Sequence, residues 1–445
     1  MSEQPFAGRS LHFVGVGGAG MSGLALVAHA LGARVTGSDR AESSYLARLR
    51  DAGIDPAIGH DAANWPAAAE VVVSTAIAPD NPELAAARAA GARVLHRGDL
   101  LAELSRLKRT IAVSGTHGKT TTASMAAHVL LGCGREPAFL IGGELRSAGT
   151  NAAWGAGEWA VIEADESDRS FLKPEREVAV ITNIELDHHA TYAGLAELEE
   201  AFAEFGAPAR VRVLGPGVEA PGESVSFGLA NADLVAATLE LTPGGSRFSV
   251  DGALVELTVP GSHNVLNALA ALAACRAAGV EPAEAAGPLA SFTGAGRRFE
   301  PHGSTVSGAL VFDDYAHHPT EVRAALEAAR TLRPARLIAC FQPHLYSRTA
   351  RLAREFGGAL ALADVVVVLD VYPARERAED HPGVSGLLVA GAAASASAGR
   401  PVWWLPAIAD AERMLAGELR EGDLLVTLGA GDVDRVARAL AGAVG

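Results

Sequence analysis

Short apolar runs alternate with amphipathic segments of helical periodicity along most of this 445-residue chain. The apolar runs at 11–16 and 110–113 are each followed by a glycine turn and then by a helical segment. From about residue 309 onward, further apolar runs alternate with helical segments. Strands that alternate with helices form a parallel sheet with helices on both faces. The pattern therefore predicts an α/β protein.

One region breaks this alternation. Residues 209–258 contain short strands and turns, including the alternating stretch RFSVDGALVELTV, and predict a small mixed-sheet insertion without chemistry. The length of the chain suggests about three domains. We expect an N-terminal Rossmann-like nucleotide-binding domain at 1–105. A central P-loop-type domain with the insertion would follow at 106–298, and a C-terminal Rossmann-like domain at 299–445.

The first glycine turn has the sequence context of a nucleotide site. Gly15, Gly17 and Gly20 have GxGxxG spacing, and they lie between a strand and a helix that ends near Leu31. A second strand then ends at Asp39. This is the arrangement of a dinucleotide-binding unit, in which a diphosphate lies at the helix N-terminus. The sequence predicts a diphosphate-bearing nucleotide here without specifying which one.

The second turn, from Ser114 to Gly118, is typical of a phosphate-binding loop. Gly115 and Gly118 allow the backbone to approach an anion, and the helix that follows offers unpaired NH groups. Lys119 adds a positive charge and Thr120 a hydroxyl suited to Mg²⁺. Position 119 holds one of only three lysines in an arginine-rich chain, which indicates that a compact ammonium is needed there. The alternative is a structural turn with an exposed lysine.

Two later strands end in side chains that could bind a metal ion. The strand WAVIEAD ends in an acidic cluster that consists of Glu163, Asp165, Glu166 and Asp168. Carboxylates placed downstream of a phosphate loop are typical of magnesium ligands, although a solvated loop is the alternative and is favoured for Asp168. The strand EVAVITNI leads into Glu185, Asp187, His188 and His189. We expect a role in the site for His188 and a local contact for His189.

Further polar residues point to nucleotide contacts. Asn264 and Asn267 lie three positions apart near the start of a predicted helix, so they share a face. Two such amides could bind a purine edge, although N-capping would explain one of them. Arg297 and Arg298 could reach phosphate from a domain hinge, or could belong to a solvated linker. In the last domain, polar residues follow the strands, where ligands of open α/β sheets bind. They are Asp313, Asp314, Tyr315, His317, His318, His344, Arg348, Asp370 and Tyr372.

The composition of the chain argues against some classes of protein. The net charge of -15 argues against a nucleic-acid-binding surface. No apolar run reaches the ~18 residues of a membrane span, and the segment MSEQPFAGRS lacks the hydrophobic region of a signal peptide. We therefore expect a cytoplasmic protein that binds neither nucleic acid nor membrane. The cysteines at 133, 275 and 340 show no metal-binding spacing and predict buried free thiols.

Nine stretches, found in order over nearly the whole chain, resemble the Mur ligases of bacterial cell-wall synthesis. They are HFVGVGGAGMSG, VSGTHGKTTT, IEADESDRSFL, NIELDHHATY, GSHNVLNALAA, FTGAGRRFE, DDYAHHPTE, FQPHLYSRT and LGAGDV. The family has a short GTxGKT form of the phosphate loop, which accounts for Val113 where the general pattern has glycine. The resemblance implies an ATP- and Mg²⁺-dependent amide ligase in peptidoglycan precursor synthesis. It would join L-alanine to UDP-N-acetylmuramate through an acyl phosphate, as a monomer or homodimer.

The resemblance also implies residue roles. Lys119, His188 and Arg298 would be catalytic, and Thr120, Glu163 and His188 would hold Mg²⁺, with His188 near the place of a carbamylated lysine in related ligases. ATP would contact Gly115, Thr116, Gly118, Lys119, Thr120, Thr121, Asn264, Asn267, Arg298 and Asp314. The UDP-sugar would contact Gly15, Gly17, Gly18, Gly20, Ser38 and Asp39. The amino acid would lie beside His344 and Arg348.

The sequence departs from the family pattern at two positions and leaves alternatives open. Leu345 follows the histidine of FQPH, where a basic residue is frequent, and Ala190 stands where aspartate is common. The first alternative is the recycling ligase of the same family, which joins a ready-made tripeptide to UDP-N-acetylmuramate. The FQPH and DVYPARE stretches favour L-alanine instead. An NAD-dependent dehydrogenase and a non-catalytic nucleotide-binding scaffold are alternatives from other classes.

Overall fold

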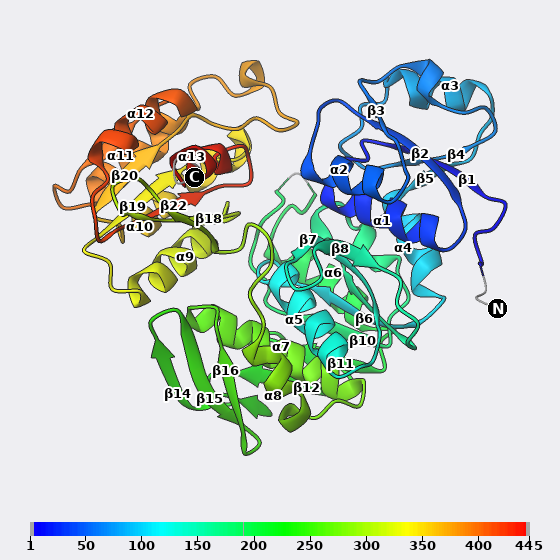
Figure 1. Ribbon diagram of the computed structural model, residues 1–445, viewed down its shortest axis with the longest axis horizontal. Coiled ribbons are helices and arrows are strands. Elements are labelled where there is room, and N and C mark those ends of the chain that lie inside the picture. The colour runs from blue at the N-terminus through cyan, green and yellow to red at the C-terminus, as the bar shows by residue number, and fades with distance from the viewer. Residues whose placement is uncertain (1–3, 190, 442–445) are drawn as a thin grey trace. The chain divides into compact units, whose positions relative to one another are not determined.

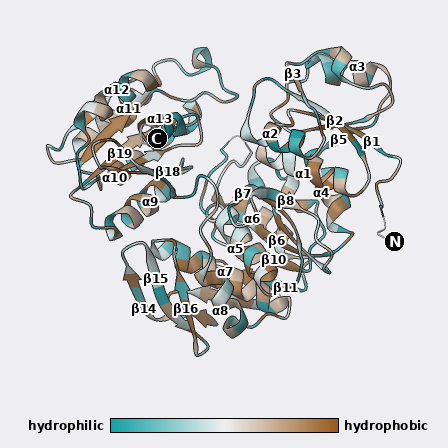
Figure 2. Cartoon of the chain, viewed as in Figure 1, coloured by the Kyte–Doolittle hydropathy of each residue, from teal (hydrophilic) through white to brown (hydrophobic). Residues whose placement is uncertain are grey.

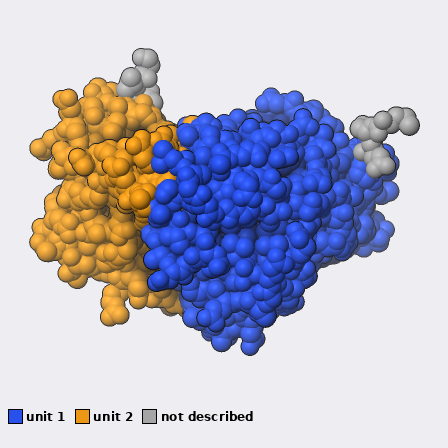
Figure 3. Space-filling view, turned by 90° about the horizontal axis from the view of Figure 1, so that it is seen from below, with its two compact units in different colours: residues 1–237, 249–255, 266–292 blue, residues 238–248, 256–265, 293–445 orange. Residues whose placement is uncertain are grey.

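The computed structural model describes residues 4–189 and 191–441, so Met1–Glu3 of the N-terminal segment and Ala190 lie outside the described residues. The chain divides into two compact units (Figure 3), and their helices and strands are labelled in Figure 1. Unit 1 comprises residues 1–237, 249–255 and 266–292, and unit 2 comprises residues 238–248, 256–265 and 293–445. In both units, parallel sheets with intervening helices confirm the predicted α/β class.

Unit 1 begins with a five-stranded parallel sheet in the order β3-β2-β1-β4-β5. Its strands are β1 (Ser10–Val14), β2 (Arg34–Asp39), β3 (Ala57–Ile58), β4 (Glu70–Val73) and β5 (Val94–His96). The helices between and after them are α1 (Ala19–Ala30), α2 (Ser44–Asp51), α3 (Pro82–Ala89) and α4 (Arg97–Ser105). Because the central strands are covered on both faces, Leu11 and Phe13 are fully buried.

The second sheet of unit 1 has eight strands in the order β13-β12-β11-β10-β6-β9-β7-β8, parallel except for the pairing of β7 with β8. Its strands are β6 (Arg109–Ser114), β7 (Ala138–Leu145), β8 (Thr150–Ala153), β9 (Trp159–Glu163), β10 (Val178–Ile181), β11 (Val211–Leu214), β12 (Ser224–Gly228) and β13 (Leu234–Val235). Helices α5 (Lys119–Gly132) and α6 (Leu195–Gly206) belong to this part of the chain. The phosphate-loop helix therefore begins one residue before the expected Thr120.

The predicted insertion at 209–258 is only partly correct. Strands β11, β12 and β13 extend the eight-stranded sheet, and only β14 (Ala237–Thr242), β15 (Gly245–Val250) and β16 (Ala253–Leu257) form a separate three-stranded sheet. The reason is that periodicity identifies a strand but not its neighbours. Helices α7 (Ser262–Ala277) and α8 (Pro282–Ala290) follow.

Unit 2 contains a six-stranded sheet in the order β17-β18-β22-β19-β20-β21, antiparallel only between β17 and β18. Its strands are β17 (Glu300–Ser304), β18 (Leu310–Asp314), β19 (Arg336–Phe341), β20 (Val365–Val368), β21 (Val402–Trp404) and β22 (Asp423–Leu428). Its helices are α9 (Pro319–Thr331), α10 (Tyr346–Leu360), α11 (Gly386–Ala396), α12 (Ile408–Glu418) and α13 (Asp434–Ala441). The sequence did not predict β17, because its residues EPHGS lack apolar alternation, and such Pro- and Gly-containing strands occur at sheet edges.

The six-stranded sheet separates two apolar cores. Along β19, Ala339 and Phe341 pack into one core, whereas Ile338 and Cys340 pack into the other. This follows from the two-residue period of a strand. The hydrophobic strands β19 and β20 are brown in Figure 2. Because both faces of these strands are buried, the polar residues lie where the strands end, at one edge of the sheet.

Two of the three free cysteines are buried. Cys275 and Cys340 are buried free thiols as predicted, but Cys133 is only partly buried, so the expectation of burial was wrong for this residue. Cys133 follows the last turn of α5, where the helix reaches the surface. Among the described residues, no helix is both long and apolar enough to cross a membrane.

Candidate active site

The phosphate loop connects β6 to α5 in a backbone conformation that requires glycine. Gly115 and Gly118 have φ angles of +126° and +82°. A Cβ atom at Gly115 would lie 2.0 Å from the Thr182 hydroxyl, and one at Gly118 would lie 2.3 Å from Oδ1 of Asn267. Gly118 is the N-cap of α5, whose first turn contains no acidic residue. The loop therefore offers backbone NH groups and a positive helix end to an anion.

Lys119 is held inside this loop. Its Nζ donates to the carbonyl oxygens of Gly115 at 2.7 Å and Thr116 at 3.1 Å, and it lies 2.9 Å from Oε2 of Glu166. Burial alone would lower the pKa of Lys119, but the nearby charges of Glu166, Asp165 and Glu163 outweigh burial and raise it. Lys119 is therefore a permanently charged ammonium beside the phosphate loop.

Thr120 and Glu163 are brought together beside the same loop. The register of β6 and β9 pairs Val113 with Glu163, which places this carboxylate next to the first turn of α5. The Thr120 hydroxyl donates to Oε1 of Glu163 at 3.0 Å, and the NH of Gly142 donates to Oε2 at 2.7 Å. A hydroxyl and a carboxylate are hard oxygen donors of the kind that Mg²⁺ prefers. The chemistry of this pair therefore fits a magnesium site.

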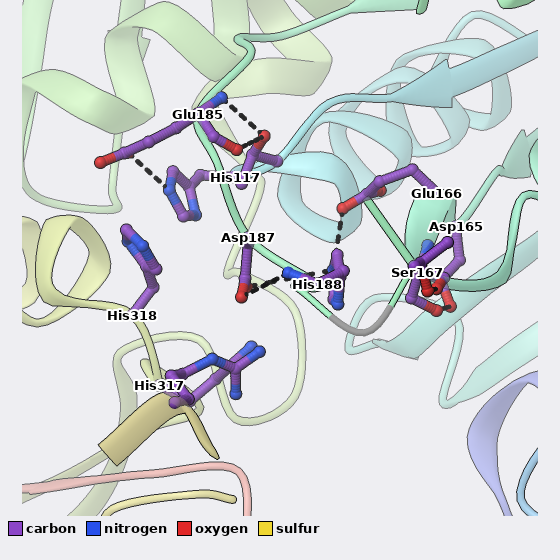
Figure 4. A network of polar contacts seen from close by, with 12 residues as sticks. His117, Asp165, Glu166, Ser167, Glu185, Asp187, His188, His317 and His318 are labelled. Carbon is purple, nitrogen blue, oxygen red and sulfur yellow. Dashed lines mark hydrogen bonds and ion pairs between the residues drawn. The ribbon is translucent and has the colours of Figure 1, made fainter. Parts of the chain in front are cut away.

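His188 joins the cluster through Glu166. Its Nε2 lies 3.1 Å from Oε1 of Glu166, and Figure 4 shows the two side chains pointing toward each other. Burial would lower the pKa of His188, but the hydrogen bond and charge of Glu166 outweigh it and raise the pKa. His188 has a φ of +53°, an unfavourable backbone conformation for a residue with a side chain. Strain of this kind is concentrated at functional sites.

The acidic cluster differs from expectation at Asp168. A solvated loop was favoured for Asp168, but only 7% of its side chain is exposed, and it accepts hydrogen bonds from Arg97 and from the NH of Ser170. Arg97 also donates to Asp165 at 2.8 Å. The expectation was wrong because the partner of Asp168 comes from α4, far away in the sequence.

The first glycine turn lies between β1 and α1, as predicted. The NH of Gly17 donates to Oδ2 of Asp39 at 2.8 Å, and a Cβ at Gly17 would lie 2.9 Å from that oxygen. Gly18 is the N-cap of α1, and Gly20 lies in the first turn of that helix. The Ser38 hydroxyl is fully buried and donates to Glu83. Only the backbone of Ser38 faces the glycine turn, where its carbonyl oxygen accepts a hydrogen bond from the NH of Gly15.

Both asparagines of α7 are buried, and neither is its N-cap, because the helix begins at Ser262. In unit 1, Asn267 accepts a hydrogen bond from the Thr122 hydroxyl at 3.3 Å. Its neighbour Leu266 lines an open pocket of about 540 Å³ formed with residues 215–219 and 226–232. In unit 2, Asn264 donates to the Pro260 carbonyl at 2.7 Å. The capping alternative is therefore excluded.

In unit 2, Asp314 accepts hydrogen bonds from the NH groups of Phe299 and Ala316. Burial raises the pKa of Asp314 to about 6, with partial opposition from the charge of Arg298. Arg298 also lies over the ring of Tyr315. Arg297 has a different position: it forms an ion pair with the buried Asp313 and binds two carbonyl oxygens of the loop at 429–431. The solvated-linker alternative is therefore wrong for Arg297.

His344 and Arg348 lie side by side at the start of α10. Nη1 of Arg348 is 3.3 Å from Nδ1 of His344, whose ring stacks on Tyr372 at a centroid distance of 5.8 Å. Leu345, which follows His344 and is the N-cap of α10, has a φ of +69° and is buried. This strained turn positions both predicted side chains at the carboxyl edge of the six-stranded sheet.

Three family models match the chain in order. They are the catalytic domain of the Mur ligase family at residues 10–109, the Mur ligase middle domain at 113–275 and the Mur ligase glutamate ligase domain at 297–431. The chain is also 47% identical to the UDP-N-acetylmuramate-L-alanine ligase of Rubrobacter xylanophilus, over 97% of this chain and 99% of that protein. The chain belongs to the Mur ligase family.

Other relatives of this Mur ligase agree with that assignment. The UDP-N-acetylmuramate-L-alanine ligase of Acidithiobacillus ferrooxidans is 44% identical, over 96% of each chain. Among solved structures, the UDP-N-acetylmuramate-alanine ligase of Thermotoga maritima is 30% identical, has a TM-score of 0.83 and covers 97% of this chain and 98% of its own. A murein peptide ligase from Psychrobacter arcticus is 26% identical, with a TM-score of 0.74 and coverage of 98% and 99%. The three-domain Mur ligase architecture is thereby confirmed.

Sequence reasoning missed two residues of this Mur ligase that connect parts of unit 1. Arg97 links α4 to Asp165 and Asp168, and a Cβ at Gly20 would lie 3.6 Å from its Nη1, so it lies between the glycine turn and the acidic cluster. Glu83 accepts hydrogen bonds from His12 on β1 and from Ser38 on β2. Neither residue belongs to a recognisable motif. Only their burial and contacts reveal them.

Proposed function

We propose that this Mur ligase uses ATP to join L-alanine to the lactyl carboxylate of UDP-N-acetylmuramate, a step of peptidoglycan precursor synthesis. The observation that carries the proposal is the cluster around Lys119, in which the phosphate loop, Glu163 and Glu166 meet at the carboxyl ends of β6 and β9. Relatives that carry this activity in their names are 44% and 47% identical over nearly the whole chain, which supports the same choice of substrates.

The proposed reaction brings two anions together. A carboxylate oxygen of the sugar attacks the γ-phosphorus of ATP, the bond to the bridging oxygen breaks, and ADP leaves. The neutral amine of L-alanine then attacks the carbonyl carbon of the acyl phosphate, the carbon–oxygen bond to phosphate breaks, and inorganic phosphate leaves with one proton of the amine. Lys119 and Arg298 would stabilise the negative charge during the first step. A unit charge at ~4 Å contributes about 4 kcal/mol at an effective dielectric constant of ~20.

Two of the side chains that would hold the divalent ion, Thr120 and Glu163, already lie together. We propose Thr120 and Glu163 as Mg²⁺ ligands, with His188 as a third. When bound, the ion would neutralise phosphate charge and polarise the γ-phosphoryl group. The NH of Gly142 fixes the orientation of the Glu163 carboxylate, and Glu166 does the same for the His188 ring.

We propose that each predicted domain supplies one part of the substrates. The domain at 1–105 would bind the UDP diphosphate at Gly15, Gly17, Gly18 and Gly20, beside Asp39. The domain at 106–298 would bind ATP through Gly115, Thr116, Gly118, Thr120 and Thr121, with the adenine near Asn264 and Asn267. The pocket beside Leu266 is large enough for a purine, which supports this placement. The domain at 299–445 would contribute Asp314 to the nucleotide and His344 with Arg348 to the amino acid.

A second candidate is ligation of a tripeptide to the same UDP-sugar, because the Psychrobacter arcticus murein peptide ligase shares the fold over the whole chain. Supplying ATP and UDP-N-acetylmuramate with either L-alanine or the tripeptide, and measuring phosphate release, separates the two. We expect release with L-alanine. Turnover with the tripeptide alone would overturn the proposal.

The same preparation tests the alternatives from other classes. A dehydrogenase would change the nicotinamide absorbance when given NAD, and the proposal expects no change. A UDP-dependent rise in the melting temperature would instead show that the protein binds UDP, as the proposal expects. A non-catalytic scaffold would release no phosphate with any of these substrates.

A further inference from the structure

A buried carboxylate, Glu83, lies next to the first glycine turn and has no role in the proposed chemistry. Glu83 is in the first turn of α3, where Asn81 caps the helix, and none of its surface is exposed. Its Oε2 accepts hydrogen bonds from Nε2 of His12 at 2.7 Å and from the Ser38 hydroxyl at 2.6 Å. A buried carboxylate is costly unless it is fully hydrogen-bonded, so the arrangement needs an explanation.

The other oxygen of Glu83 holds the loop after β3. Oε1 lies 3.1 Å from Nδ1 of His60 and accepts from Asn64 at 3.2 Å and from the NH of Asp61 at 3.3 Å. One carboxylate therefore ties together β1, β2 and the segment that follows β3. Burial alone would raise the pKa of Glu83, but hydrogen bonds from His12, Ser38, Asn64 and His60 outweigh it and lower the pKa to about 2. Glu83 is an anion at neutral pH.

His60 is the histidine of this network that is partly exposed. Its side chain is 23% exposed, compared with none for His12 and Glu83. Its Nδ1 is occupied by Glu83 and by the Ser38 hydroxyl at 3.0 Å. Within the described part of the chain, Nε2 of His60 has no protein partner. A carboxylate at Nδ1 fixes the position of one proton on the ring and leaves Nε2 for a ligand.

The position of His60 places it beside the glycine turn. The NH of Gly59 donates to the carbonyl oxygen of Asp39 at 2.7 Å, and the carboxylate of Asp39 accepts from the NH of Gly17. The register pairs Asp39 with Ile58, so His60 emerges at the carboxyl edge of the sheet next to the end of β2. Ligands of open α/β sheets bind at this edge, and a diphosphate lies where the helix after β1 begins.

We propose that Glu83 is a positioning residue of the UDP-sugar site, which it serves by orienting His60 so that Nε2 hydrogen-bonds the diphosphate. This inference rests on the proposed function, because that function supplies the diphosphate ligand. Glu83 itself does not touch the ligand. Its role is to hold the imidazole in one orientation, as a buried carboxylate does for a histidine that contacts a substrate.

A double-mutant cycle tests this role with the full-length protein. The dissociation constant of UDP-N-acetylmuramate is measured by calorimetry for wild type, Glu83→Gln, His60→Ala and the double variant. If Glu83 acts through His60, each single substitution weakens binding about tenfold, and the double variant binds no more weakly than His60→Ala. The turnover number at saturating substrate stays within about twofold of wild type. Additive losses, or unchanged binding in Glu83→Gln, would overturn the proposal.

Glu70→Gln is the matched control, because Glu70 lies on β4 of the same sheet and pairs with Arg9 and Arg93. It should leave binding of the UDP-sugar unchanged. If Glu83→Gln does not fold, nitrogen NMR of the wild-type histidines decides, with the His60 signals assigned by their loss in His60→Ala. A proton on Nδ1, with an Nε2 signal that shifts on addition of UDP, supports the proposal. A proton on Nε2 alone, or no shift, contradicts it.

The two proposals fail in different ways. If wild-type protein neither binds UDP-N-acetylmuramate nor releases phosphate, the proposed function is wrong. If wild type binds and turns over, but the cycle gives additive losses, only the role of Glu83 is wrong. Because the calorimetry is done without ATP, its result does not depend on the phosphate loop.

Discussion

The ammonium of Lys119 and the carboxylate of Glu166 form a buried ion pair, with Nζ 2.9 Å from Oε2 and only 1% of the Glu166 side chain exposed. Glu166 also binds His188, and its backbone oxygen accepts from the Tyr192 hydroxyl at 2.7 Å. Glu166 therefore neutralises the positive charge of Lys119. We propose that this same charge contacts the γ-phosphate of bound ATP. ATP binding would therefore exchange one anionic partner of Lys119 for another.

Replacing Lys119 should abolish this exchange. Lys119→Ala removes a contact of about 4 kcal/mol, so kcat/KM should fall on the order of a thousandfold. Lys119→Arg should also fail, because a planar guanidinium does not fit a site with two carbonyl oxygens and a carboxylate around one nitrogen. Steady-state kinetics measure both effects. Lys173→Ala, which breaks an exposed pair with Asp99, is the control and should keep nearly full activity. Equal activity of Lys119→Ala and this control would refute the assignment.

Adding one methyl group to the phosphate loop should weaken ATP binding specifically. In Gly118→Ala the new carbon would lie 2.3 Å from Asn267, at a φ of +82°. We expect KM for ATP to rise at least about tenfold, because the loop must move away from its anion-binding conformation. Gly134→Ala is a matched control, since Gly134 has a φ of +65° but no atom within 4 Å of the added carbon. It should lower the melting temperature slightly and leave KM for ATP unchanged.

The magnesium requirement should depend on the Thr120 hydroxyl. Thr120→Val keeps the shape of the side chain but removes the donor to Glu163, so half-maximal activity should need about tenfold more free Mg²⁺. Thr120→Ser keeps the hydroxyl and should behave like wild type. Rates are measured against free Mg²⁺ at a fixed ATP concentration. An unchanged Mg²⁺ dependence in Thr120→Val would remove Thr120 from the proposed ligands.

Asp314 should make the stability of the protein depend on pH. Its pKa is raised from an ordinary 3.8 to about 6 in the folded state, so the folded state holds a proton that the unfolded state has released between these values. Stability should therefore fall as pH rises from about 4 to 6, by up to about 3 kcal/mol. Asp314→Asn resembles the protonated form and should lack this loss. The melting temperatures of the two proteins should be similar near pH 4 and should favour the variant at pH 7. A constant difference across this range would contradict the assignment.

Some parts of the site could be predicted from sequence because they are local. A glycine turn between a strand and a helix specifies its own backbone, which is why Gly115, Gly118 and Lys119 were found as a loop. The strand of Glu163 was equally clear, because an apolar run ended in acids. Long-range partners could not be predicted in this way. Glu166 is 47 residues from Lys119 in sequence, and their pairing depends on the register of two strands.

The errors have related causes. Asp168 was expected to be solvated because nothing near it in sequence is basic except Arg169, whereas its partner Arg97 comes from another element. The strands of 209–258 were assigned to one insertion because alternation does not reveal which sheet a strand joins. The strain at His188 and Leu345 is also invisible in sequence, because both residues normally avoid positive φ. Such exceptions to local preference are expected at functional sites.

In the proposed reaction ATP activates the sugar carboxylate as an acyl phosphate, and the fate of the carboxylate oxygen is the sharpest test of this step. UDP-N-acetylmuramate labelled with ¹⁸O in its lactyl carboxylate is converted with ATP and L-alanine, and the released phosphate is analysed by mass spectrometry. We expect one labelled oxygen in inorganic phosphate, together with ADP. Unlabelled phosphate, or label in AMP with release of pyrophosphate, would contradict it.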